Sequence, residues 1–420
     1  MRLTLKNICK IKEATVDLNG ITVIAGENNT GKSTVGKILY SVFNSFYKID
    51  DQIYKEREES IKHILSPVSF NAYIKTEHGS FIEAFISSII NDEEKYKSNP
   101  ELLKQELRDF VVQLDKHNMQ SLAQFPQEEM VNRILEVISI PRDVILKTIL
   151  TKKINTEFNG QVNNIYANSK GGIELIINNE TILIEVQTHK VQSISNVLNL
   201  NTEVIYIDDP FVLDEGMYRG FPLGRYIDHR HHLKLKLFDN SKDNVINEML
   251  TANKLENIYS KINNICSGEL VKNKYSNYGY KKTGEDEVLE LRNISTGLKT
   301  FVILKTLLLN RSLEENGTII LDEPEIHLHP EWQLIFAELI VLLQKEFGVR
   351  ILLNTHSPYF LNAIEVYAAK HKIADRCKYY IADLDEDAAI ISDVTENIEE
   401  IYRKLAGPLQ DLENVRYNND

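Results

Sequence analysis

The chain has 420 residues, 43% of them hydrophobic and 26% charged, which is the composition of an ordinary soluble globular protein with room for a sizeable core. Its formal net charge of −13 argues against a surface that holds nucleic acid by bulk charge alone. It shows no signal peptide and no apolar run of the roughly 20 residues that span a membrane, and its three cysteines are scattered, so we expect a cytoplasmic protein with no membrane contact.

The N-terminal third predicts strands and then helices. Residues 2–8 and 12–18 alternate between apolar and polar side chains, and residues 20–26 form a mostly apolar strand that ends in glycine. A helix is predicted to begin at Gly31. Residues 51–150 are charged and poor in glycine, with apolar residues at helical spacing, which predicts a helical insertion without a long coiled coil.

The rest of the chain alternates strands and helices. Residues 154–190 have a β pattern, with a hairpin over 173–187 that turns at "NNE", and residues 202–210 contain a buried strand. We then expect the following elements in order: an amphipathic helix over 243–266, a strand over 288–291, a helix from Thr296, strands in 317–322 and 349–355 around a helix over 330–347, and a tail of two short strands and a helix over 377–420. This order predicts one α/β domain folded from two distant parts.

The stretch "GENNTGKST" fits the pattern Gly-x4-Gly-Lys-Ser/Thr between a strand and a helix. Backbone N–H groups of such a loop surround a phosphate at the positive end of a helix dipole. We expect Lys32 to reach the β- and γ-phosphates of a nucleotide and Ser33 to bind Mg²⁺. The alternative is a glycine turn that matches by chance. The expected nucleotide-binding residues are Gly26, Asn28, Asn29, Thr30, Gly31, Lys32, Ser33 and Thr34.

Two further strands end in residues that suit the same chemistry. "TIILDE" ends in Asp322, placed to hold Mg²⁺, and in Glu323, which could orient or deprotonate the attacking water. "NTHSP" places His356 after a buried strand, where it could contact the γ-phosphate. The alternatives are an exposed acidic turn before Pro324 and a histidine with ordinary partners. Beside a phosphate loop, the catalytic interpretation is favoured for both.

The stretch "NISTGLKTF" offers a second helix N-terminus to an anion. Ser295 is a candidate N-cap, Gly297 leaves the first turn bare, and Lys299 follows. The alternative is a plain helix cap. Because one chain needs only one phosphate site, a second one suggests a nucleotide shared between two copies of the chain.

Two groups of histidines could also suggest a metal site. His327 and His329 are too few for zinc, and loop structure or contact with a second subunit is favoured for them. The stretch "YIDHRHHLKLK" (226–236) holds Asp228, His229, His231 and His232, with Arg225 just before it, and could form a metal or nuclease centre. A polar lid or partner-binding surface is favoured there instead.

Taken together, these motifs resemble the ABC-type ATPase heads of the SMC, RecF and OLD families. "GENNTGKST" is similar to the Walker A motif, "STGLK" to a degenerate ABC signature, "TIILDEPEIHLHP" to the Walker B motif with the D-loop, and "NTHSP" to the switch histidine. "DEPEIHLHPEWQ" followed by "THSPYFL" is especially similar to stand-alone bacterial ATPases grouped with OLD proteins, many of them encoded in anti-phage defence loci.

The resemblance implies a homodimer that sandwiches two ATP molecules between its heads. It assigns Mg²⁺ to Ser33 and Asp322, the catalytic base to Glu323 and the switch to His356, while Ser295 and Gly297 would contact the γ-phosphate in trans. The implied fold is an α/β ABC-ATPase head made of residues 1–50 and 190–420, with a β-hairpin subdomain over 151–190 and a helical insertion over 51–150. The Q-loop glutamine is not placed, and "IADLDED" (381–387) is expected to be a hairpin turn, not a nuclease motif.

The functional expectation is an ATP-hydrolysing dimeric switch that controls a separate effector protein, in anti-phage defence or a toxin-like system. The runner-up is a DNA-repair or DNA-processing ATPase of RecF type that acts on DNA ends or gaps. A self-contained nuclease and a transporter subunit are less favoured alternatives.

Overall fold

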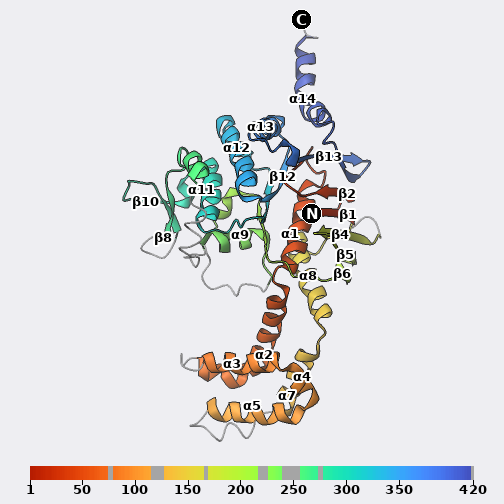
Figure 1. Cartoon of the computed structure of the whole chain (residues 1–420), viewed down its shortest axis with the longest axis vertical. Coiled ribbons are helices and arrows are strands. Elements are labelled where there is room, and N and C mark those ends of the chain that lie inside the picture. Colours follow the sequence, from red (N-terminus) through yellow and green to blue (C-terminus); the bar gives the residue numbers. More distant parts are fainter. Residues whose placement is uncertain are drawn as a thin grey trace. The chain divides into compact units, whose positions relative to one another are not determined.

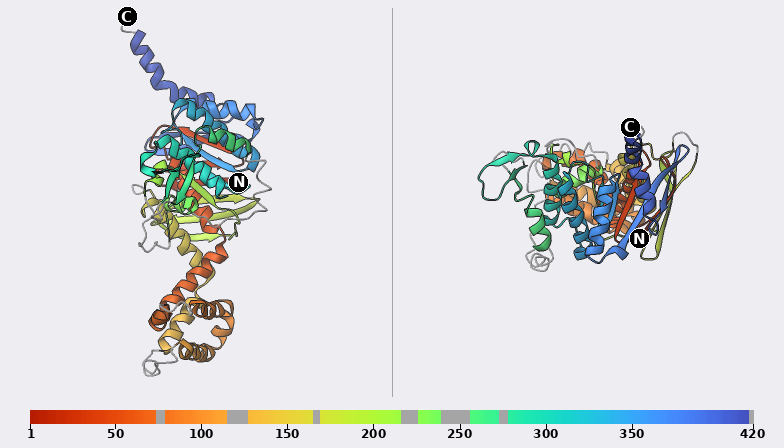
Figure 2. Two further views of the ribbon diagram at one scale, coloured as in Figure 1. Left: turned by 90° about the vertical axis from the view of Figure 1, so that its left-hand side faces the viewer. Right: turned by 90° about the horizontal axis from the view of Figure 1, so that it is seen from above.

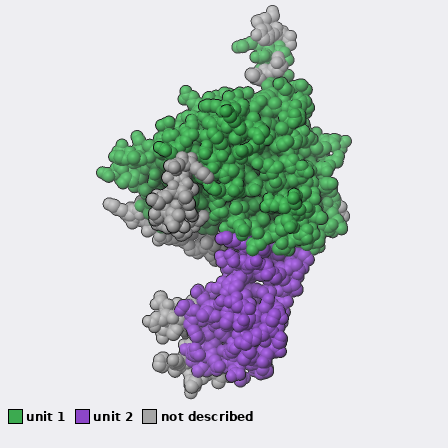
Figure 3. Space-filling model, in the orientation of Figure 1, with its two compact units in different colours: residues 1–47, 150–420 green, residues 48–149 purple. Residues whose placement is uncertain are grey.

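The computed structural model describes residues 1–73, 79–114, 127–164, 169–215, 226–238, 256–272 and 278–417. They form two compact units, one made of residues 1–47 and 150–420 and the other of residues 48–149 (Figure 3). No helix in these ranges is both long enough and apolar enough to cross a membrane.

The larger unit is built on an eleven-stranded sheet whose order is β6-β5-β4-β1-β2-β14-β13-β3-β12-β11-β7 (Figure 1). One half of it is parallel. All residues of β3 and β11 are buried, as expected for strands covered on both faces. The parallel strands are β7 (Val204–Ile207), β11 (Thr318–Asp322), β12 (Arg350–Thr355), β3 (Ile21–Gly26) and β13 (Cys377–Asp385).

The other half of the sheet is antiparallel except where β14 and β2 run parallel. The predicted hairpin is confirmed, and it turns at Asn178 and Asn179, whose φ angles of 50° and 69° suit asparagine. A second tight hairpin continues into β6, which the sequence pattern missed. These strands are β14 (Ala388–Asp393), β2 (Ile11–Asp17), β1 (Arg2–Ile8), β4 (Gly171–Ile177), β5 (Glu180–Gln187) and β6 (Lys190–Ser195).

The helices of the larger unit begin and end at recognisable caps. Ser295 caps α11, and Pro330 occupies the first turn of α12, which ends at Gly348 with a φ of 63°. The last helix, α14, extends away from the sheet (Figure 2). The helices are α1 (Lys32–Phe46), the end of α8 (Arg142–Phe158), α9 (His229–Phe238), α11 (Thr296–Leu309), α12 (Pro330–Phe347), α13 (Pro358–Lys370) and α14 (Glu399–Tyr417).

Side chains point alternately to the two faces of each parallel strand, and helices cover both of these faces. Ile319 and Leu321 point into the main core, together with side chains of α11, α12 and α13. Tyr206 and Ile320 face α1, where both lie close to Gly36. The parallel half is therefore the middle layer of a three-layer arrangement.

Several sequence expectations need adjustment. Residues 154–158, expected to be β, are the last turns of α8. The polar stretch 267–286 contains two strands of a small separate sheet, in the order β10 (Val288–Glu290), β9 (Tyr278–Lys281), β8 (Glu269–Lys272). The helix expected over 243–266 is seen at residues 256–263, and its first part lies outside the described residues. "IADLDED" does form a hairpin turn between β13 and β14.

The smaller unit is helical and has its own hydrophobic core. Ile86, Leu107 and Ile134 are fully buried in it, and the rings of Phe85 and Phe110 stack at 4.1 Å between centroids. Its helices are α2 (Ile49–Tyr73), α3 (Gly79–Asn91), α4 (Glu93–Ser98), α5 (Pro100–Leu114), α7 (Gln127–Ser139) and the start of α8.

Candidate active site

The loops that follow β3, β11 and β12 open at the same edge of the sheet. These strands are parallel and adjacent, with Thr355 opposite Ala25 and Asp322 opposite Asn354. Ligands of open α/β sheets bind outside the carboxyl ends of the strands. The fold therefore brings the phosphate loop, the acidic turn and the segment of His356 to one place.

The phosphate loop, residues 26–34, joins β3 to α1. Gly31 has a φ of 83°, a left-handed conformation that glycine adopts without strain, and it precedes the first helical residue, Lys32. No side chain in the described part of the chain caps α1, so its first N–H groups remain available to an anion. Thr30 stabilises the loop by donating from Oγ1 to the Glu27 carbonyl over 2.8 Å.

Lys32 lies between the phosphate loop and two acids. Its Nζ donates to the carbonyls of Gly26 and Glu27 over 3.0 and 2.7 Å and lies 3.9 Å from Glu323 Oε1. Only 5% of its side chain is exposed. Burial lowers the pKa of Lys32, and the nearby carboxylates of Glu323 and Asp322 oppose that shift. Lys32 therefore lies beside the acids at the end of β11, a contact that the sequence did not predict.

Asp322 is buried at the end of β11, where two donors fix its carboxylate. Tyr206 Oη donates to Oδ2 over 2.7 Å, and Asn354 Nδ2 donates to Oδ1 over 2.9 Å. Both partners come from strands next to β11. Neither was predicted from the sequence, in which Tyr206 looks like an ordinary core residue of a strand.

Glu323 is held in a backbone conformation that is rare for a residue with a side chain. Its φ is 50°, and its N–H donates to the Asn354 carbonyl over 2.9 Å. The carboxylate lies 3.2 Å from His356 Nδ1, although the two groups are not aligned for a hydrogen bond. Lys32, Glu323 and His356, predicted from three separate motifs, are neighbours.

A third acid, Glu325, lies behind Glu323 and was not predicted. Its side chain is buried, and Oε1 accepts a hydrogen bond from Thr355 Oγ1. Burial raises the pKa of Glu325. Thr355 Oγ1 also accepts from the Ser357 N–H over 3.0 Å. This contact joins the segment after β11 to the segment that carries His356.

The signature segment packs against the D-loop, residues 324–329. Ser295 accepts from the Leu298 N–H as the N-cap of α11. A Cβ on Gly297 would lie 2.9 Å from the His327 carbonyl, so only glycine fits there. The expectation that Lys299 lies beside an anion at this helix N-terminus needs correction. Its side chain is buried and forms an ion pair of 2.7 Å with Asp214. It does not offer its charge to an anion at the start of the helix.

The histidines have structural partners. His329 is the N-cap of α12, and the His327 ring contacts Phe211 at 5.5 Å between centroids. His229 is buried between Glu157 at 2.7 Å and Asp208 at 3.1 Å. His229 thus belongs to an interior ion-pair network and not to an exposed polar lid or partner-binding surface, and Arg225 lies outside the described residues. Among the residues that are described, no group of three or more metal-ligating side chains is assembled.

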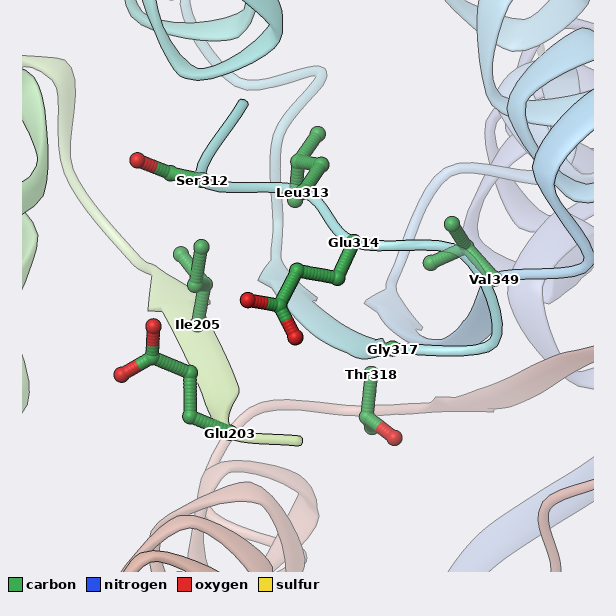
Figure 4. Close-up of a pocket in the computed structure, with 8 residues that line it drawn as sticks. All are labelled: Glu203, Ile205, Ser312, Leu313, Glu314, Gly317, Thr318 and Val349. Atoms are coloured by element: carbon green, nitrogen blue, oxygen red, sulfur yellow. The ribbon is translucent and has the colours of Figure 1, made fainter. Parts of the chain in front are cut away.

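A small hollow lies at the other edge of the sheet. Figure 4 shows Glu203, Thr318 and Val349 among its lining residues, at the amino ends of β7, β11 and β12. Because the phosphate loop follows the carboxyl end of β3, this hollow is separate from the nucleotide site. Glu203 is itself paired there, with His232 at 3.1 Å and with Lys236 at 2.5 Å.

Comparison with known proteins identifies the family. Residues 1–361 match the family model described as an AAA ATPase domain. The chain belongs to this family. Its fold is the mixed α/β arrangement described above.

Individual relatives are more distant. The "Retron Vc95 probable ATPase" of Vibrio cholerae serotype O1 biovar El Tor is 32% identical over 87 residues, which is 18% of this chain and 16% of that protein. The SMC head domain from Thermotoga maritima has a TM-score of 0.38 at 12% identity and covers 94% of this chain and 98% of its own. An SMC head bound to the C-terminal winged-helix domain of ScpA has a TM-score of 0.44 at 11% identity, covering 93% and 97% of the two chains.

The site residues suit a magnesium–nucleotide complex. Mg²⁺ prefers oxygen ligands and is usually held by one or two protein groups together with substrate phosphates. The hydroxyl of Ser33 is exposed beside the loop, and the Asp322 carboxylate is near enough to Lys32 to influence its pKa. This donor set fits the ion that the family implies.

Proposed function

We propose that this ATPase is a dimeric molecular switch, driven by ATP and Mg²⁺, that controls a separate effector protein in anti-phage defence or a toxin-like system. The observation that carries the enzymatic part is the meeting of Lys32, Glu323 and His356 beside an open helix N-terminus. These groups can act on one phosphate and one water molecule.

In the proposed reaction, N–H groups of residues 26–34 bind the phosphates of ATP. Lys32 leaves its two loop carbonyls and turns to the β- and γ-phosphates. Ser33 and Asp322 would hold Mg²⁺, which neutralises developing phosphate charge when bound. Glu323 accepts a proton from the attacking water as the water oxygen bonds to the γ-phosphorus. The bond from that phosphorus to the bridging oxygen breaks, and ADP is the leaving group. His356 contacts the γ-phosphate and orients Glu323.

The proposed partner in catalysis is a second copy of the chain, whose Ser295 and Gly297 would complete the site. Support comes from large apolar side chains that are exposed close to the D-loop. Ile326 is 50% exposed, Phe211 is 42% exposed beside His327, and Tyr359 is 45% exposed near Pro330. Apolar groups gathered next to a polar active site suit a protein interface.

Control of an effector is supported by two observations. The relative described above is named as the probable ATPase of a retron. In addition, the helical unit 48–149 has a core of its own, so it can present a surface without altering the ATPase sheet. The RecF-type alternative is disfavoured by the net charge of −13.

The test is native mass spectrometry of the Glu323→Gln protein, purified from its own cells with ATP and Mg²⁺. Loss of the base should reduce ATP hydrolysis at least about a hundredfold and trap an ATP-bound dimer. The matched control is Glu346→Gln, near the C-terminal end of α12, and it should behave as wild type.

A second polypeptide in fixed ratio with the trapped dimer would support the switch. A trapped dimer that carries only nucleic acid would instead favour the DNA-processing ATPase. Unchanged hydrolysis in Glu323→Gln would contradict the assignment of the base.

A further inference from the structure

Tyr206 makes a buried polar contact from β7, the strand that ends the sheet order next to β11. It is the third residue of β7, 1% of it is exposed, and its hydroxyl lies 2.7 Å from Asp322 Oδ2. A carboxylate can only accept, so the hydroxyl donates. Buried hydroxyl groups are normally hydrogen-bonded, and the partner of the Tyr206 hydroxyl is Asp322, the last residue of the neighbouring strand β11.

The tyrosine ring is fixed from two sides. On one side it stacks on His229, with 4.3 Å between ring centroids and 24° between the ring planes. On the other side lies α1, where a Cβ on Gly36 would come within 3.2 Å of the hydroxyl. The hydroxyl therefore has little freedom to point anywhere but at Asp322.

His229 is in turn held by charges from two other elements. Glu157, near the end of α8, lies 2.7 Å from Nδ1 and also accepts from the His229 backbone N–H over 2.7 Å. Asp208, just after β7, lies 3.1 Å from Nε2 and is paired with Arg230. This network joins α8, β7 and α9 around the ring on which Tyr206 rests, and it accounts for the acidic end of "YIDDP" and for the histidine-rich stretch.

We propose that Tyr206 is a positioning residue for the Walker B carboxylate, and that the network of Glu157, His229 and Asp208 holds Tyr206 in place. With Oδ2 bound to Tyr206 and Oδ1 to Asn354, the carboxylate cannot rotate, and its remaining lone pairs keep a fixed direction. This rests on the proposed role of Asp322 in holding Mg²⁺. Preorganised ligands bind a metal more tightly than mobile ones, because less entropy is lost on binding.

The experiment measures the affinity for a fluorescent ADP analogue, by anisotropy, across a Mg²⁺ titration and in EDTA. Tyr206→Phe keeps the ring and its stacking but removes the donor. The matched control is Tyr380→Phe, which is equally buried in β13 of the same sheet and whose hydroxyl contacts the Asp17 N–H instead. Asp322→Asn reports on the magnesium site itself, and thermal unfolding of each variant reports on folding.

Tyr206→Phe should raise the Mg²⁺ concentration needed for tight binding roughly tenfold, the factor expected for a hydrogen bond to a charged group. Affinity in EDTA and thermal stability should match Tyr380→Phe. Should Tyr206→Phe prove unstable, Gly36→Ala tests the same contact, because its methyl group displaces the hydroxyl without removing it, and a smaller loss in the same direction is expected.

The outcomes distinguish the positioning role of Tyr206 from the proposed function. If Asp322→Asn loses Mg²⁺ dependence and Tyr206→Phe keeps that of the wild type, the positioning role is wrong and the proposed function stands. If Asp322→Asn also behaves as wild type, the magnesium assignment fails and the positioning role fails with it. A shift in Tyr206→Phe that Tyr380→Phe reproduces would also overturn the proposal.

Discussion

Glu325 is more deeply buried than the two acids before it, Asp322 and Glu323. Only 2% of it is exposed, one oxygen accepts from Thr355, and the other, Oε2, has no hydrogen-bond partner among the residues that the structure describes. Burial raises its pKa above the ordinary value of 4.5. The folded protein therefore favours the neutral carboxyl more than the unfolded chain does.

The sign of the resulting pH dependence follows from linkage. A raised pKa in the folded state gives stability that is complete below pH 4.5 and is lost as the pH rises through the folded pKa. Glutamine keeps the acceptor for Thr355 without the charge. We expect Glu325→Gln to be more stable than wild type at pH 8 by about 1 kcal/mol, because a charge buried away from water is removed, and to lose that advantage below pH 4.5.

Urea unfolding without nucleotide, between pH 4 and pH 8, measures this difference. Glu331→Gln, at an exposed position six residues further on, is the control and should show no such trend. A Glu325→Gln protein that is less stable than wild type throughout would mean that the charged form is stabilised in place.

The site residues that were predicted from the sequence differ from those that were missed in how far along the chain their partners lie. Lys32, Glu323 and His356 belong to short motifs whose spacing reflects one shared ligand. Tyr206 and Asn354 act on Asp322 from other strands, far away in the sequence, and no local pattern records that pairing. Lys299 was misassigned for the same reason, because its partner Asp214 lies 85 residues away.

At the scale of elements, Glu338 ties three helices together. It lies on α12, where Lys261 contacts one carboxylate oxygen at 2.7 Å while Lys370 and His371 contact the other at 2.9 and 3.0 Å. Burial alone would raise the pKa of Glu338, but the hydrogen bonds from these cations outweigh it and bring the pKa to about 2. The network joins α12 to α13 and to the helix over 256–263.

Glu338→Gln should therefore destabilise the protein by roughly 2 kcal/mol at pH 7. A lowered pKa gives stability that is present above pH 4.5 and lost as the pH falls towards about 2, so the difference from wild type should shrink over that range. Thermal unfolding at pH 7 and at pH 3 measures it, with half-buried Glu346→Gln on the same helix as control. An undiminished difference at pH 3 would show that packing, not charge, is what the substitution disturbs.

Elements with strong periodicity were predicted well, and short polar ones were not. The helix over 330–347 begins at Pro330 and is followed by Gly348, two residues typical of helix ends, and the structure gives the same bounds. Strands β8 and β9 were missed because they are short, polar and paired mainly with each other and with β10. Residues 154–158 continue α8, whose packing overrides a local pattern that suits a strand.

At the scale of the whole molecule, the unit 48–149 should fold by itself. Its core residues all come from within that range, and side chains such as Leu107 are completely buried in it. We expect the isolated fragment to be helical by circular dichroism and to unfold cooperatively. Leu107→Ala should cost about 2–5 kcal/mol, whereas Val112→Ala on the same helix, at 48% exposure, should cost little. Equal effects would indicate a loose helical state without a packed core.

The position of β3 constrains how the chain can be made. This strand carries the phosphate loop, yet both of its neighbours, β12 and β13, come from residues 350–385. Because translation proceeds from the N-terminus, β3 is synthesised long before β12 and β13. Both edges of β3 therefore stay unpaired while the helical insertion and the middle of the chain are synthesised. Such edges invite aggregation. The nucleotide site can therefore form only after β12 and β13 have been synthesised.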